Sequence, residues 1–160
     1  MKRILSLAFV LMCYTIAFAQ LTVKTSQVKY ETIGTLRLSY ATVGMSVTEE
    51  GDTAVYIQSR STNQFDSAYL FCLGLNPQSA LATAIDLVKL ADALEVKGII
   101  TVEDAIRHEY TIMKKNVLGA PALYLQGSGY AGTFNLTPKE IVKCKDIIKE
   151  HFKLQEPKQD

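Results

Sequence analysis

The sequence contains no tryptophan and only two histidines, His108 and His151. A metal site needs three or four convergent ligands, and neither histidine has a second histidine one helical turn away or a Cys-x-x-Cys pair nearby. No Gly-x-Ser-x-Gly motif, which presents a serine nucleophile in many hydrolases, is present. The missing tryptophan also argues against sugar binding by ring stacking. We therefore assign no catalytic residue, no cofactor and no metal ligand, and we favour a protein that is not an enzyme.

Neither sign of charge is in excess. Without Lys2 and Arg3, which belong to the leader described below, the chain has 15 basic and 16 acidic residues. Basic side chains in the segment 139–150 are interspersed with acidic ones, which is typical of a solvated helix face. Nucleic-acid-binding proteins carry clustered basic residues, so we predict no nucleic acid partner.

No apolar run reaches the ~20 residues that a membrane-spanning helix requires. The longest run covers residues 4–16, after Met1-Lys2-Arg3 and before Ala17-Phe18-Ala19. A positive start, a short apolar run and a site with small residues at Ala17 and Ala19 are typical of a secretory signal peptide. We predict that residues 1–19 are removed, so that the mature protein begins at Gln20, has no membrane span and is secreted or periplasmic.

The rest of the chain is long enough for one domain that needs no disulfide. We predict a single α+β domain over residues 20–154 and a flexible tail over 155–160, a segment without an aliphatic or aromatic side chain to bury. A lipidated Cys13 is disfavoured, because Met12 stands where lipoprotein signals have a small residue. Cys72 lies in a predicted strand and Cys144 on the apolar stripe of a predicted helix, so we expect two buried free thiols rather than a disulfide.

Alternation of apolar and polar residues predicts two runs of strands. The first run contains strands near 36–40, 55–58 and 67–73, with turns at Ile33-Gly34-Thr35 and at 49–52. The second contains strands near 99–102, 109–114, 122–126 and 130–136. Successive strands with short connections predict an antiparallel sheet of about seven or eight strands.

One helix is predicted after each run of strands. Asn76 and Pro77 have the N-cap and first-turn chemistry of a helix that Lys97-Gly98 would end, and Thr137-Pro138-Lys139-Glu140 is a capping box. We expect both helices to pack on one face of the sheet in an α+β fold. The two helix starts lie 61 residues apart, which is compatible with an internal duplication, but shared capping chemistry explains the recurrence more simply.

Residues 127–132 match Gly-x-Gly-x-x-Gly. In a dinucleotide site these glycines open a helix, whereas here a strand-like segment follows and only 28 residues remain. A hairpin turn is the better interpretation.

Tyrosine is frequent in the predicted strands, where it supplies a rigid contact area at small entropic cost. We select a possible recognition surface of four tyrosines, although tyrosine also simply favours strands: Tyr40, Tyr56, Tyr124 and Tyr130. Two tripeptides resemble the Asp-Ser/Thr-apolar acceptor for O-glycosylation of exported proteins in some Gram-negative bacteria. Their acceptor residues are Thr53 and Ser67.

The favoured function is a non-catalytic exported domain that binds another protein or a component of the bacterial envelope through its sheet. Two alternatives remain open: a small exported hydrolase with a dispersed site, and a carrier of a small ligand in a cavity between sheet and helices. A filled core with an aromatic surface patch favours the binding domain over both.

Overall fold

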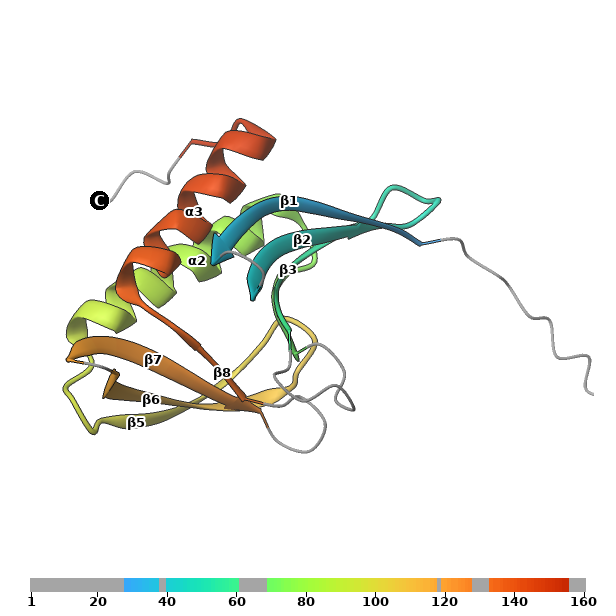
Figure 1. Ribbon diagram of the computed structural model, residues 1–160. Coiled ribbons are helices and arrows are strands. Elements are labelled where there is room, and N and C mark those ends of the chain that lie inside the picture. The colour runs from blue at the N-terminus through green and yellow to red at the C-terminus, as the bar shows by residue number, and fades with distance from the viewer. Residues whose placement is uncertain (1–27, 38–39, 61–68, 118, 128–132, 156–160) are drawn as a thin grey trace, which may run out of the picture.

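The computed structural model describes residues 28–37, 40–60, 69–117, 119–127 and 133–155. The predicted signal peptide, with its cleavage site at Ala17, Ala19 and Gln20, lies outside these residues, as do Ser67 and Tyr130. Figure 1 shows two sheets with a pair of helices beside them.

The first half of the chain is an antiparallel meander followed by a helix. Its strands are β1 (Lys29–Arg37), β2 (Ala41–Val47), β3 (Thr53–Ser59) and β4 (Tyr69–Gly74), which pair in chain order, and its helix is α2 (Pro77–Ala93).

The second half repeats this order of elements. Its strands are β5 (Ile99–Glu103), β6 (Glu109–Val117), β7 (Ala120–Gly127) and β8 (Thr133–Leu136), again paired in chain order, and its helix is α3 (Pro138–Phe152). The predicted α+β class and the recurrence of strands and then a helix are therefore confirmed.

The eight strands form two sheets of four rather than the single sheet that we predicted. The reason lies at the free edge of β4, where the turn after β5 takes the place of another strand. The backbone N–H of Ala105 donates to the carbonyl of Cys72 at 3.1 Å, and the N–H of Cys72 donates to the Asp104 carboxylate at 3.3 Å. Both backbone groups of Cys72 are therefore satisfied without a fifth strand in the first sheet.

Both helices pack against the first sheet and against each other. Helix α2 contacts β3 and β4, whereas α3 contacts β1 and β2 and also reaches β7. The inner face of the second sheet joins the same cluster of buried side chains. Its largest fully buried members come from both sheets and both helices: Val43, Ile57, Phe71, Leu73, Leu81, Tyr110, Ile112, Leu123, Leu125, Leu136, Ile141 and Ile148.

The two helix starts are as predicted. Asn76 and Thr137 each accept a hydrogen bond from the backbone N–H three residues on, and each belongs to a reciprocal capping box with proline in the first turn. Helix α2 ends at Ala93 with Leu94 as its C-cap, earlier than the predicted Lys97-Gly98, and Lys97 instead takes a positive φ of 75° in the turn before β5.

The predicted turn at Ile33-Gly34-Thr35 is wrong, because these residues continue β1 across two irregularities in its pairing with β2. Glycine is needed there for a different reason: a Cβ on Gly34 would lie 2.6 Å from a methyl carbon of Ile147 on α3. The predicted strand through Tyr40 is also wrong. Tyr40 lies in the turn between β1 and β2, with its N–H bonded to the Arg37 carbonyl.

Residues after the Gly-x-Gly-x-x-Gly stretch form β8, which pairs antiparallel with β7 from Gln126 opposite Thr133. The strand predicted after this motif is therefore present and pairs antiparallel with the strand before it, as in a hairpin. Residues 128–132 themselves lie outside the described part of the chain.

Candidate binding surface on the first sheet

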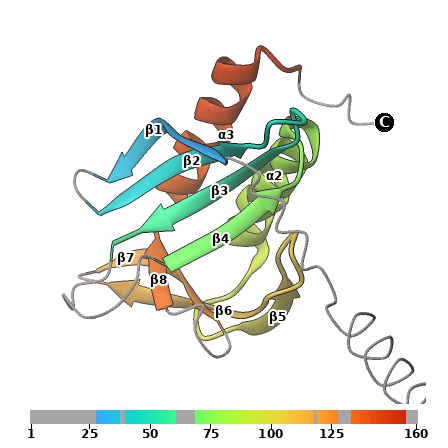
Figure 2. The ribbon, with the colours of Figure 1, turned by 90° about the vertical axis from the view of Figure 1, so that its right-hand side faces the viewer.

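The first sheet has one face toward the helices and one face away from them, and Figure 2 looks onto the latter. We call it the outer face. Strand register places alternate residues of neighbouring strands side by side: Tyr30 is opposite Ser46, Gly44 is opposite Tyr56, and Tyr56 is opposite Cys72. Helices α2 and α3 lie behind this face in Figure 2, and the fully buried residues Val43, Ile57 and Phe71 belong to the other half of the alternation.

The outer face holds a groove of about 400 Å³, which we call the sheet groove. Its wall residues come from all four strands and from the turn after β5: Tyr30, Ser46, Ala54, Tyr56, Gln58, Leu70, Cys72 and Ile106. Three of the large side chains are substantially exposed, at 72% for Tyr30, 47% for Leu70 and 49% for Ile106. Exposed apolar side chains gathered around one hollow are typical of a contact surface rather than of scattered surface residues.

The ring of Tyr56, which lines the groove, packs directly against Gly44 on the neighbouring strand β2. A Cβ added to Gly44 would lie 2.6 Å from the Tyr56 ring, so only glycine allows this close approach. The phenol hydroxyl donates to the Met45 carbonyl at 3.3 Å. Burial, with a smaller contribution from Tyr30, raises the pKa of Tyr56 above its ordinary value of 10. The ring is therefore held in place and stays neutral.

A second, more polar hollow of about 370 Å³ continues the outer face beyond Gln58, which lines both. Its other wall residues are Thr32, Tyr40, Thr42 and Arg60. The outer face is thus apolar toward Leu70 and Ile106 and polar toward Tyr40 and Arg60.

Ile106 reaches the groove because a buried carboxylate fixes the turn that carries it. Asp104, whose side chain is 1% exposed, accepts hydrogen bonds from the backbone N–H groups of Ile106 at 3.0 Å and His108 at 2.8 Å, besides the one from Cys72. Tyr110 adds a further link, because its hydroxyl donates to the Leu70 carbonyl. Burial, and then the negative charge of Asp104, raises the pKa of Tyr110 to about 12, which keeps this donor protonated.

Cys72, His108 and Asp104 lie near one another, a combination that occurs in cysteine hydrolases. The His108 Nδ1 atom is 3.8 Å from an Asp104 carboxylate oxygen. Burial and the charge of Asp104 raise the pKa of Cys72, however, and its sulfur lies 3.9 Å from the Gly74 carbonyl. A nucleophilic cysteine needs the opposite shift, toward the thiolate, so this arrangement favours a structural thiol.

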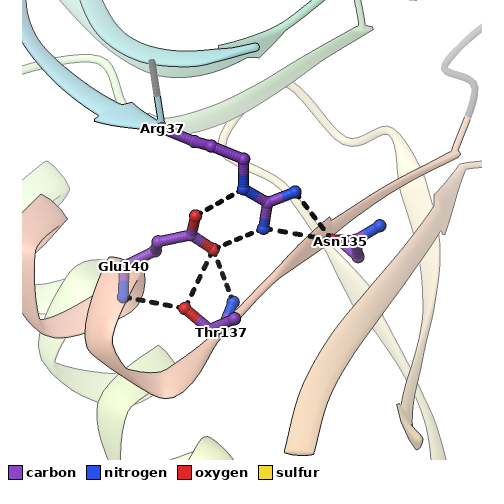
Figure 3. Close-up of polar contacts among 4 residues, drawn as sticks. All are labelled: Arg37, Asn135, Thr137 and Glu140. Carbon is purple, nitrogen blue, oxygen red and sulfur yellow. Dashed lines mark hydrogen bonds and ion pairs between the residues drawn. The ribbon is translucent and has the colours of Figure 1, made fainter. Parts of the chain in front are cut away.

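Opposite the Asp104 turn, Arg37 at the end of β1 joins the two halves (Figure 3). Its guanidinium donates to both Glu140 oxygens, at 2.6 and 2.7 Å, and to the Asn135 side-chain oxygen at 3.2 Å. Glu140 also accepts from the N–H and the hydroxyl of Thr137. Burial pushes the Glu140 pKa upward, but the bonds from Arg37 and Thr137 outweigh it and leave this pKa below its ordinary value. Arg37 and Glu140 therefore form a charged junction between β1, β8 and α3.

The predicted tyrosines are only partly brought together. Tyr56 lines the sheet groove, Tyr40 lines the polar hollow, and Tyr40 and Tyr124 both line a hollow of about 310 Å³ between the two sheets. Tyr124 also lies under the Lys115 ammonium, 5.2 Å from its ring centre. Tyr130 lies outside the described residues. The sequence therefore identified one member of the sheet groove, Tyr56, whereas Tyr40 and Tyr124 meet at a different hollow.

Thr53, the one predicted glycosylation acceptor that the structure describes, lies at the start of β3 with its hydroxyl bonded to the Gly51 carbonyl at 3.3 Å. The two cysteines of the described chain, Cys72 and Cys144, are both free and buried, as predicted. Burial raises the pKa of Cys144 to about 12.

Sequence reasoning missed three groove residues, Tyr30, Leu70 and Ile106. Leu70 could have been found from strand alternation. The core-facing residues of this strand are Tyr69, Phe71 and Leu73, so Leu70 and Cys72 lie on the opposite face. The position of Ile106 depends on the turn that Asp104 fixes. No local sequence pattern predicts that a turn will pack against another sheet.

Within the described ranges, no three His, Cys, Asp or Glu side chains gather closely enough to hold a metal ion, and no helix is both long and apolar enough to span a membrane. Comparison of the chain with family models, with curated proteins and with solved structures finds no match.

Proposed function

We propose that this protein is an exported, non-catalytic binding domain that recognises another protein, or an envelope component, through the sheet groove. The observation that carries the proposal is the joint position of Tyr30, Leu70 and Ile106, three exposed large side chains from three separate elements, around one hollow on the outer face.

The construction of the groove supports this role. Its floor is a tyrosine fixed on Gly44, and one wall is a turn fixed by a buried carboxylate. A preformed surface loses little conformational freedom on binding, which favours affinity. Tyrosine, which the groove contributes at Tyr30 and Tyr56, is also enriched at the centres of protein interfaces.

The two alternative functions gain less support. A carrier needs an internal cavity, whereas side chains of both sheets and both helices meet in one buried cluster. A hydrolase that uses Cys72 as its nucleophile needs an activated thiol, whereas burial raises the pKa of this thiol. We therefore place the function on the outer face.

The test compares two isoleucines exposed on different surfaces. Ile106→Asp puts a charge into the groove, and Ile99→Asp puts the same charge on β5, where the side chain is 60% exposed. We expect the partner captured from envelope extract by the mature protein to be lost with Ile106→Asp and kept with Ile99→Asp. Equal capture by both variants would place recognition elsewhere on the molecule.

The exported location is tested separately by the mass of the mature protein, which should correspond to a chain that begins at Gln20.

A further inference from the structure

Strand β1 is an edge of the first sheet, and its two halves differ (Figure 2). The second half carries the irregularities after Thr32 and lies under α3, with Ile147 against Gly34. The first half, Lys29–Thr32, pairs regularly with Gly44–Val47 of β2 and is exposed at every residue. A regular, exposed edge strand can accept a further strand through its unpaired backbone groups.

The sequence of this first half is complementary to itself in the antiparallel direction. When two copies pair with Tyr30 opposite Tyr30, Lys29 of each copy faces Glu31 of the other. Lys29 and Glu31 project from one face of β1 and Tyr30 from the other, since side chains alternate along a strand. The pairing therefore joins two pairs of opposite charges on one face and two tyrosines on the other.

We propose that a second copy of this chain pairs with β1, antiparallel and centred on Tyr30, to give a dimer with a continuous eight-stranded sheet. Cross-strand aromatic pairs and opposite charges both stabilise neighbouring strands, and the charges also fix the register. Because Tyr30 lines the sheet groove, the pairing brings the two grooves of the dimer together at its centre. The inference does not depend on the proposed function, since the dimer exists whether or not the grooves bind a partner.

The contact is short, so the dimer should be weak and depend on protein concentration and salt. Sedimentation equilibrium of the mature protein measures it. We expect self-association at low salt that weakens as salt is added. A wild-type protein that stays monomeric up to about 1 mM, a concentration at which even contacts worth ~4 kcal/mol are half formed, would overturn the proposal.

Charge reversal tests the register. Lys29→Glu places Glu opposite Glu31, and Glu31→Lys places Lys opposite Lys29, so each variant alone should lose at least ten-fold in dimerisation constant. An equimolar mixture of the two restores both opposite pairs and should restore the dimer as a heterodimer. Both side chains are exposed, so neither change threatens the fold.

The matched control reverses one exposed charge of each sign away from β1, with Lys139→Glu and Glu95→Lys. These variants change the net charge equally and should dimerise like the wild type. Loss of dimer in the controls, or failure of the β1 mixture to associate, would show that net charge rather than strand pairing governs the association and would overturn the proposed register.

Discussion

Two carboxylates hold the halves of this molecule together at opposite ends, and they are stabilised differently. Glu140 meets a guanidinium from β1 at one junction, whereas Asp104 meets only backbone N–H groups as close partners at the other. The Arg37 side chain remains 39% exposed and that of Glu140 12%, while that of Asp104 is 1% exposed. The Glu140 junction therefore consists of opposite charges near solvent, and the Asp104 junction consists of a buried charge held by peptide dipoles.

This difference predicts how much stability each junction should lose when one of its side chains is mutated. A partly exposed ion pair contributes modestly, because water solvates both partners once they separate. A buried acceptor leaves donors without partners when it is removed, and each unsatisfied donor costs free energy. We therefore expect the Asp104 junction to be the more sensitive to mutation.

Asp104→Ala should have the largest effect, a loss of about 3 kcal/mol in the free energy of unfolding, because three backbone N–H groups lose their acceptor. Asp104→Asn keeps one acceptor oxygen and should lose less. Urea titration followed by circular dichroism measures both. The control is Asp86→Ala, which removes an exposed carboxylate paired with Lys89 at 3.4 Å and should change the stability by less than ~0.5 kcal/mol. Equal losses at Asp104 and Asp86 would contradict the comparison.

Arg37→Met should come second, with a loss of about 1–2 kcal/mol at neutral pH. The folded-state pKa of Glu140 is lowered, so its contribution to stability is present above the ordinary pKa of 4.5 and is lost as the pH falls through the lower folded value. The difference between wild type and variant should therefore shrink as the pH is lowered below 4.5. A difference that stays constant over that acidic range would mean that the guanidinium does not cause the shift.

Mutations at the two helix N-caps should have the smallest effect on the free energy of unfolding. Thr137→Ala and Asn76→Ala should each cost about 1 kcal/mol through a lost side-chain bond to a backbone N–H. Only Thr137 also donates to the carboxylate that Arg37 binds. In double mutants with Arg37→Met, the Thr137 change should therefore be non-additive and the Asn76 change additive. Coupling of Arg37 to Asn76 of the same size would refute this distinction.

Local chemistry was predictable from the sequence, and contacts between distant segments were not. Capping residues act on donors three positions away, so Asn76 and Thr137 marked the true helix starts. Gly34 looked like a turn residue because glycine is common in turns, while its actual constraint is the approach of Ile147, which is far along the chain. The division into two sheets had the same kind of cause, since it depends on the Asp104 turn meeting Cys72.

The candidate site follows the same rule. Tyr56 could be selected by residue type and strand alternation. Alternation does not say which sheet a strand joins, so it did not indicate that Tyr56 and Tyr124 lie on different sheets. Arg37 was placed in a predicted strand but not in a junction, since Glu140 lies 103 residues away in sequence. Residue type indicates which side chains can take part in a binding site, and the topology of the fold decides which of these side chains lie close together.

The packing of α3 on β1 has a consequence for the order of folding. The last helix of the domain covers the first strand, so part of β1 stays without its cover until the chain through Phe152 is available. The meander β1–β4 can pair locally and early, because its strands are neighbours in sequence, but the contact between Gly34 and Ile147 joins two residues that lie far apart in sequence. The step that completes the domain is therefore the docking of its final helix on the second half of β1.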